Sequence, residues 1–140
     1  MKKFPFYHQL DAMDCGPTCL KMVAKHYGKT YSLENLRSKS YISREGVSLL
    51  GISEAGENIG FRTLGVKINF DKLVAEAPLP CIVHWKQNHF VIVYKISKKK
   101  NKVYVADPAH GLVKYTIAEF LQGWISDKSS EGDEGVALLL

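Results

Sequence analysis

The chain lacks most of the features that set a protein apart from ordinary globular domains. Only three of its 140 residues are cysteines, Cys15, Cys19 and Cys81, so any disulfide would leave one thiol unpaired. A chain of this length buries a core without disulfides, so we expect a reducing compartment. No apolar run approaches membrane-spanning length, and the basic start Met1–Pro5 lacks the apolar stretch of a secretion signal. The sequence therefore predicts neither a membrane span nor a signal peptide.

Strong charge of one sign is also absent. The chain has 19 basic and 14 acidic side chains, which give a net charge of +5. Its densest basic run, Lys98–Lys100 with Lys102, lies between two strand-like segments, where a hairpin turn exposes it to solvent. Because the other basic residues are dispersed and are not interleaved with aromatic ones, we expect no nucleic-acid partner.

The first half of the sequence has helical periodicity. Apolar residues recur at helical spacing over Cys15–Tyr27, and Gly28 is a typical helix end. Ser32 is the expected N-cap of a short helix over 32–37. A third helix is expected over Val47–Ile59, where Gly60 supplies the end.

The second half changes to the alternating, β-branched composition of strands, with short turns that favour antiparallel pairing. A single helical turn is expected at Asp71–Ala75, a capping box at Thr116–Glu119 begins a further helix, and Asp127–Gly135 is expected to be a polar loop. The expected strands are Phe61–Ile68, Cys81–Trp85, His89–Tyr94, Val103–Ala106, Val113–Tyr115 and Val136–Leu140. The predicted fold class is α+β, with a helical lobe followed by an antiparallel sheet.

Cys15 stands where the first helix is predicted to begin. Pro17 suits the first helical turn because its missing N–H has no partner there. A thiol at this position faces free backbone N–H groups and the positive end of the helix dipole, which favour the nucleophilic thiolate. A buried cysteine that only fills space is the alternative, and the local pattern leaves the two interpretations equally open.

The histidines that could accept a proton from Cys15 are His8, His26, His84, His89 and His110. His26 lies about three turns along the same helix, roughly 16 Å away. His84 lies within an apolar strand, as a sheet-face histidine does, and His110 belongs to a turn. His89 opens a strongly apolar strand, so the sheet anchors its backbone while its side chain stays accessible at the strand end.

Asp107 is expected to lie beside His89. If the strand that begins at His89 returns through a turn centred near residue 98 or 99, His89 faces residue 107, 108 or 109. An aspartate one pairing step away can accept the ring N–H and stabilise the imidazolium. Pro108 ends the strand and keeps the carboxylate at its rim. Cys15, His89 and Asp107 thus form a predicted Cys-His-Asp arrangement for attack on an acyl carbon.

Two donors are available for the oxyanion of such a reaction. One is the backbone N–H of Cys15, at the start of the helix. The other is the side-chain amide of Gln9, six residues earlier. One such donor typically lowers the activation barrier by ~3 kcal/mol. Taken alone, Gln9 would be a surface glutamine.

A zinc site is the main competing chemistry. Cys15 and Cys19 are four residues apart, on one helical face, and with His84 and His89 they could complete a tetrahedral set. The sequence contains no C-x-x-C or H-x-x-x-H pair, so we expect no metal and assign Cys19 and Cys81 to the core.

The motifs together resemble the N-terminal peptidase domain of peptidase-containing ABC transporters, which process bacteriocins with double-glycine leaders. The resemblance spans residues 4–125 and rests on five separated blocks: Gln9, Asp14–Leu20, Arg44–Ser48, His84–Trp85 followed by Asn88–Val91, and Asp107–Pro108.

This resemblance implies a papain-like fold for a single domain over 1–140, cut from a longer transporter chain. It implies that Cys15 is the nucleophile, His89 the general base and acid, Asp107 the residue that orients His89, and Gln9 the oxyanion donor.

The resemblance also implies the partners. The substrate would be a ribosomally made precursor peptide with an amphipathic helical leader, cut after a Gly-Gly type site. The domain would lie on the cytoplasmic side of the bacterial membrane, attached to transmembrane and ATPase domains. No cofactor is expected for proteolysis, and ATP only for the transporter part.

Two other interpretations stay open beside a peptidase: a non-catalytic domain that only docks the leader, and another papain-like enzyme such as an amidase or transferase. The presence of Cys15, His89, Asp107 and Gln9 argues against the first. The Arg44–Ser48 and His84–Val91 blocks argue against the second.

Overall fold

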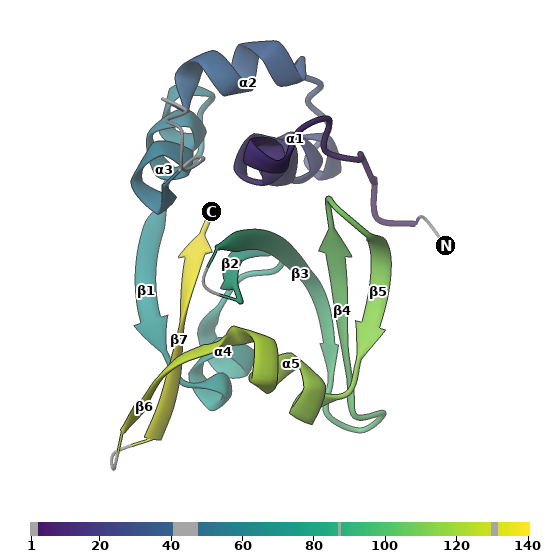
Figure 1. The fold of residues 1–140 in the computed structure, drawn as a ribbon, viewed down its shortest axis with the longest axis vertical. Helices are drawn as coiled ribbons and strands as arrows, with labels where there is room; N and C mark the ends of the chain where they lie inside the picture. Colours follow the sequence, from purple (N-terminus) through teal and green to yellow (C-terminus); the bar gives the residue numbers. More distant parts are fainter. Residues whose placement is uncertain (1–2, 41–47, 87, 130–131) are drawn as a thin grey trace.

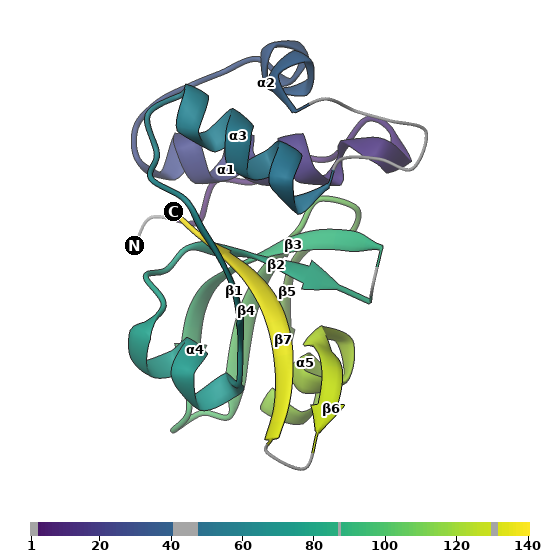
Figure 2. The same cartoon turned by 90° about the vertical axis from the view of Figure 1, so that its left-hand side faces the viewer.

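The computed structural model describes residues 3–40, 48–86, 88–129 and 132–140. Three helices lie together on one side of a twisted sheet: α1 (Cys15–His26), α2 (Leu33–Lys39) and α3 (Leu49–Asn58) (Figures 1 and 2). A short 3-10 turn, η1 (Ala12–Asp14), leads into α1. Two further helices, α4 (Phe70–Glu76) and α5 (Ile117–Trp124), pack on the other side of the sheet.

Every strand pair in the sheet is antiparallel. The order is β1-β7-β2-β3-β4-β5, and β6 pairs with β7 beside this path. The strands are β1 (Leu64–Ile68), β2 (Cys81–Trp85), β3 (His89–Ser97), β4 (Lys102–Asp107), β5 (Gly111–Tyr115), β6 (Ile125–Ser129) and β7 (Gly132–Leu139). The last strand, β7, therefore lies inside the sheet, between the edge strand β1 and β2.

Successive side chains along the strands point into two apolar cores, one on each face of the sheet. Ile82, Phe90 and Ile92 pack against Cys19 and other residues of α1. The intervening residues of the same strands face the second core, which contains the buried side chains of α4 and α5. Because neighbouring strand residues point to opposite faces, both cores form from one continuous apolar run in each of β2 and β3.

The helix starts follow the sequence. Ser32, Ser48 and Asn69 each accept a backbone N–H of the following helical turn, and Thr116 with Glu119 forms the expected capping box. The predicted helices over Cys15–Tyr27 and 32–37 are confirmed, with bounds that shift by two residues or fewer. The expected start of the third helix at Val47 lies outside the described residues. Ser48 is described as the N-cap of α3, which runs over Leu49–Asn58.

Three expectations were wrong in extent or kind. The single turn expected at Asp71–Ala75 is the seven-residue helix α4. The strand expected from Phe61 begins only at Leu64. The described residues of the polar loop expected over Asp127–Gly135 are strand residues of β6 and β7, because the two strands pair with each other and supply the hydrogen bonds that their polar composition does not suggest.

No helix in the described part of the chain is long and apolar enough to cross a membrane.

The contact between α5 and β2 fixes the end of β2 that leads to His89. The ring of Trp85, the last residue of β2, lies against Gly123 of α5, and the Lys86 N–H donates to the Gly123 carbonyl at 2.8 Å. Trp85 also packs on Tyr115, with ring centroids 5.3 Å apart. A side chain at position 123 would displace this ring.

We expect Gly123→Ala to destabilise the protein. Its Cβ would lie 2.5 Å from Cζ2 of Trp85, so the ring must move. Overpacking of this kind typically costs about 2 kcal/mol, which exceeds the ~1 kcal/mol gained by replacing a helical glycine with alanine. Gly65→Ala is the matched control, because its Cβ meets only Leu49 Cδ2 at 3.5 Å. Urea denaturation of both variants measures the difference, and equal stability would contradict the packing argument.

Candidate active site

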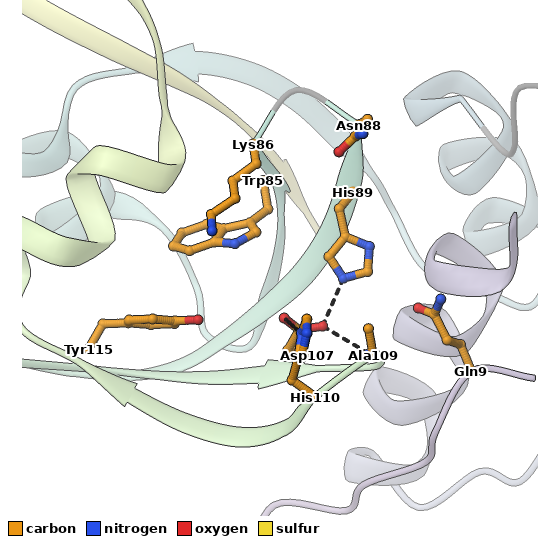
Figure 3. A pocket seen from close by; sticks show the side chains of 9 residues that line it. All are labelled: Gln9, Trp85, Lys86, Asn88, His89, Asp107, Ala109, His110 and Tyr115. Carbon is orange, nitrogen blue, oxygen red and sulfur yellow. Dashed lines mark hydrogen bonds and ion pairs between the residues drawn. The ribbon is translucent and has the colours of Figure 1, made fainter. Parts of the chain in front are cut away.

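The strand ends of β3 and β4 bring two predicted site residues together. His89 opens β3 and Asp107 ends β4, and Nε2 of His89 lies 2.8 Å from Oδ1 of Asp107 (Figure 3). Ile92 pairs with Ala106, which is within the register expected from the turn position. A one-residue shift between Val93 and Lys95 changes the register only on the side toward the hairpin turn. The predicted proximity of His89 and Asp107 is thus confirmed.

Cys15 reaches the same place from the helical layer. It is the first residue of α1, it is 5% exposed, and it packs in the core between α1 and β3. Its side chain faces His89 closely enough to act on the imidazole through a hydrogen bond. Because Nε2 of the ring is taken by Asp107, Nδ1 is the nitrogen left to exchange a proton with the thiol.

The two partners change the acidity of His89. Burial alone would lower the pKa of His89, but the hydrogen bond to Asp107 and the contact with Cys15 outweigh it and raise the pKa to about 9. The imidazole therefore favours its protonated form over the neutral pH range.

Asp107 is kept ionised by three donors. Burial alone would raise the pKa of its carboxyl, but hydrogen bonds from His89, from His110 and from the Ala109 N–H lower the pKa to about 2. The carboxylate is only 3% exposed, so it stays fixed beside His89 as a negative charge. It can orient the imidazole and stabilise its protonated form.

His110 is a site neighbour that the sequence interpretation missed. It was expected to be only a turn residue, yet its Nδ1 lies 2.9 Å from Oδ2 of Asp107. The spacing of three residues across the turn at Pro108 is the signal that could have revealed it, because an aspartate that opens a turn commonly binds groups two or three residues on.

Gln9 is held beside the catalytic strands by its backbone. Its N–H donates to the carbonyl of Pro108 at 2.9 Å, so the segment before α1 is tied to the turn after Asp107. Its side chain points toward His89, and its Oε1 is buried without a hydrogen-bond partner (Figure 3). Gln9 thus lines the same pocket as His89 and Asp107, and its role as an oxyanion donor stays a prediction.

A pocket of about 350 Å³ opens from these residues. Figure 3 shows the side chains of His89, Asp107 and Gln9 at its α1 side and the rings of Trp85 and Tyr115 at its far side. The remaining lining residues are Lys86, Asn88, Ala109 and His110. The imidazole of His89 is therefore accessible from the pocket.

The other cysteines and His84 do not assemble a metal site. Cys19 is fully buried and its thiol donates to the Phe90 carbonyl at 3.4 Å, and Cys81 is buried in the second core. His84 lies against the ring of Phe90. Among the residues that the structure describes, no group of three or more His, Cys, Asp or Glu side chains could hold a metal ion.

A nucleophile on a helix, facing an imidazole and a carboxylate on an antiparallel sheet, defines the class of papain-like cysteine peptidases. The chain belongs to the peptidase C39 family, whose family model matches residues 3–127. This finding confirms the α+β papain-like fold and the peptidase class expected from the motifs.

The relatives in sequence are bacteriocin-processing transporters. The chain is 36% identical over 129 residues to the lactococcin-G-processing and transport ATP-binding protein of Lactococcus lactis, which covers 89% of this chain and 18% of the relative. It is 37% identical over 110 residues to the probable microcin-H47 secretion/processing ATP-binding protein of Escherichia coli, which covers 79% of this chain and 15% of the relative. The match thus covers less than a fifth of either relative.

Solved structures agree with this assignment. A double glycine motif protease of an AMS/PCAT transporter, solved in complex with the leader peptide, superposes with a TM-score of 0.85 at 33% identity and covers 98% of this chain and 90% of that one. The peptidase domain of Streptococcus ComA, a bifunctional ABC transporter of a quorum-sensing pathway, gives a TM-score of 0.84 at 29% identity, over 98% of this chain and 97% of that one.

We expect iodoacetamide at neutral pH to alkylate Cys15 at least about tenfold faster than the other two thiols. Burial raises the pKa of Cys19 well above its ordinary value and that of Cys81 to about 12, and neither thiol is exposed. Peptide mapping by mass spectrometry measures the three rates. The urea-unfolded chain is the control, in which all three should react alike; equal rates in the folded protein would contradict the assignment of Cys15.

The raised pKa of His89 should make stability depend on pH. Because the pKa of His89 is higher in the folded chain than in the unfolded one, the protonated imidazole stabilises the folded protein. This contribution is complete below the unfolded pKa of 6.5 and is lost as the pH rises through the folded pKa of about 9. We compare the free energy of unfolding of the wild type with that of His89→Gln. The difference in favour of the wild type should be up to about 3 kcal/mol smaller at pH ~10 than at pH ~6. Urea denaturation across this range tests it, and an advantage that grows with pH would refute the assignment.

Proposed function

We propose that this chain removes the leader from a ribosomally made precursor peptide by cutting after a Gly-Gly type site. The observation that carries the proposal is the meeting of Cys15, His89 and Asp107 from α1, β3 and β4 in a C39 peptidase fold. The solved relative that holds a leader peptide in a domain of the same fold supports the choice of substrate.

The proposed reaction has two steps, formation of a thioester and its hydrolysis, and His89 transfers a proton in each. The Cys15 thiolate attacks the carbonyl carbon of the second glycine, and protonated His89 then gives its proton to the leaving amine. The thioester that remains is hydrolysed by water, from which His89 takes a proton. Asp107 holds the imidazole in place throughout.

The oxyanion would be stabilised by two donors. The backbone N–H of Cys15 lies at the start of α1, where the first N–H groups have no acceptor within the helix. The side-chain amide of Gln9 would supply the second, since the amide lies at the pocket edge beside His89. Its loss should cost about two orders of magnitude in kcat.

The preference for two glycines has a steric explanation. A narrow slot beside Cys15 would exclude substrates with side chains at the two positions before the cut, because a Cβ there would clash with the walls of the slot. Further affinity would come from the leader, bound as an amphipathic helix on an apolar surface.

We further infer that the chain is the peptidase part of a transporter with transmembrane and ATPase domains, at the cytoplasmic face of the membrane. Its relatives are ATP-binding transport proteins several times its length. Proteolysis itself would need no metal or cofactor, because thiolate, imidazole and oxyanion donors all come from the chain, and ATP would serve export.

Cleavage of a synthetic precursor peptide tests the function. We expect the wild type to cut a peptide with an amphipathic leader that ends in Gly-Gly, with Cys15→Ala at least about 10⁴-fold slower and Gln9→Ala about 10²-fold slower. A peptide with Ala-Val in place of Gly-Gly is the substrate control. Mass spectrometry of the products locates the cut.

Two outcomes would contradict the proposal. An uncut Gly-Gly peptide that still binds tightly would indicate a docking domain without catalysis. Full activity in Cys15→Ala would exclude the cysteine mechanism.

A further inference from the structure

The residue before the nucleophile is a buried carboxylate with an unusual partner. Asp14 is 1% exposed and forms two hydrogen bonds with Arg37 of α2, from Nε to Oδ1 at 2.9 Å and from Nη2 to Oδ2 at 2.6 Å. The Arg37 side chain itself is 42% exposed. The proposed mechanism uses neither residue.

Asp14 ends the 3-10 turn η1 and directly precedes α1. The turn runs into the helix without a break, and the side chain of Asp11 caps it by accepting the Met13 N–H at 3.0 Å. The Asp14 carboxylate accepts no backbone N–H of α1, and Arg37 donates a hydrogen bond to each of its oxygens. The buried charge beside the proposed nucleophile is therefore held by a side chain of α2.

Arg37 holds the Asp14 carboxylate in a fixed position. Its Nε and Nη2 groups each donate to a different carboxylate oxygen, so both oxygens are engaged.

Arg37 also cancels a charge beside the nucleophile. An unpaired carboxylate on the residue next to Cys15 would repel the thiolate in a site with little water. The fork of a guanidinium neutralises it with fixed geometry, which a lysine cannot do. The charged or titratable groups that the described structure places around Cys15 and Arg37 are Asp11, Asp14, Cys19, Glu34, His89 and Asp107.

We propose that Arg37 is a positioning residue for the proposed nucleophile, and that it acts through Asp14 by fixing its buried carboxylate and neutralising its charge. Its effect on turnover rests on the proposed peptidase function, whereas its effect on the thiol does not. The structure thus assigns α2 a part in the active site that it never touches.

The test compares Arg37→Met with the double variant D14N/R37M. Each is followed by the pH dependence of Cys15 alkylation with iodoacetamide, and by kcat and KM on the Gly-Gly precursor peptide. Lys67→Met is the matched control, because it removes an exposed ion pair with Asp127 of the same 2.6 Å length far from the site. Circular dichroism checks that each variant is folded.

We expect Arg37→Met to move the alkylation profile by about one pH unit toward higher pH and to slow alkylation about tenfold at pH 6. Its kcat should fall by a similar factor with KM within twofold, since the residue touches no substrate. D14N/R37M should return the profile to within 0.3 units (about twofold) of the wild type, and Lys67→Met should leave it unchanged.

An unshifted profile in Arg37→Met, or a double variant shifted as far as the single one, would overturn the proposal and leave the ion pair a purely structural role. If Arg37→Met does not fold, Arg37→Lys keeps a cation without the paired hydrogen bonds, and the profile should shift in the same direction by less; an unshifted Arg37→Lys profile then overturns it. If the wild type cuts no peptide while the alkylation shift appears, the proposed function fails and the positioning role stands.

Discussion

The active site depends above all on the ion pair between His89 and Asp107, which the antiparallel register of β3 and β4 produces. The first residue of one strand and the last residue of the next meet at 2.8 Å, so neither side chain needs a loop to position it. The pair raises the pKa of the imidazole to about 9 and lowers that of the carboxyl to about 2. Each group thereby favours the charged form of the other. The backbone of the sheet thus sets the protonation states that the chemistry requires.

The site lies between two layers, so its geometry also depends on how the layers are joined. The core between α1 and β3 buries Cys19 and sets the distance of Cys15 from the sheet. The hydrogen bond from Gln9 to the Pro108 carbonyl ties the segment before α1 to the end of β4. The third connection is the hydrogen bond from Arg37 of α2 to Asp14, the residue before the proposed nucleophile. Three separate connections therefore converge within a few residues of Cys15.

Local rules predicted most of the elements, because their signals lie within a few residues of one another. The capping residues Ser32 and Thr116 begin helices as expected, and the apolar strand Cys81–Trp85 has the predicted bounds. The stretch Asp127–Gly135 was predicted as a loop because its composition is polar; its described residues are strand residues because β6 pairs with β7, which continues into the sheet between β1 and β2. The link between His110 and Asp107 was missed because a turn brings two side chains together without an apolar pattern to indicate it.

The sequence by itself determined the chemistry: a thiol before a helix, a histidine at a strand start, an aspartate before a proline and a glutamine upstream. These are local features, and hairpin geometry alone relates His89 to Asp107. Only the tertiary structure decided which cysteine faces the imidazole, where the last strand enters the sheet, and that Asp14 binds Arg37. Such contacts join residues more than twenty positions apart, and no periodicity within a segment records them because packing of separate elements creates them.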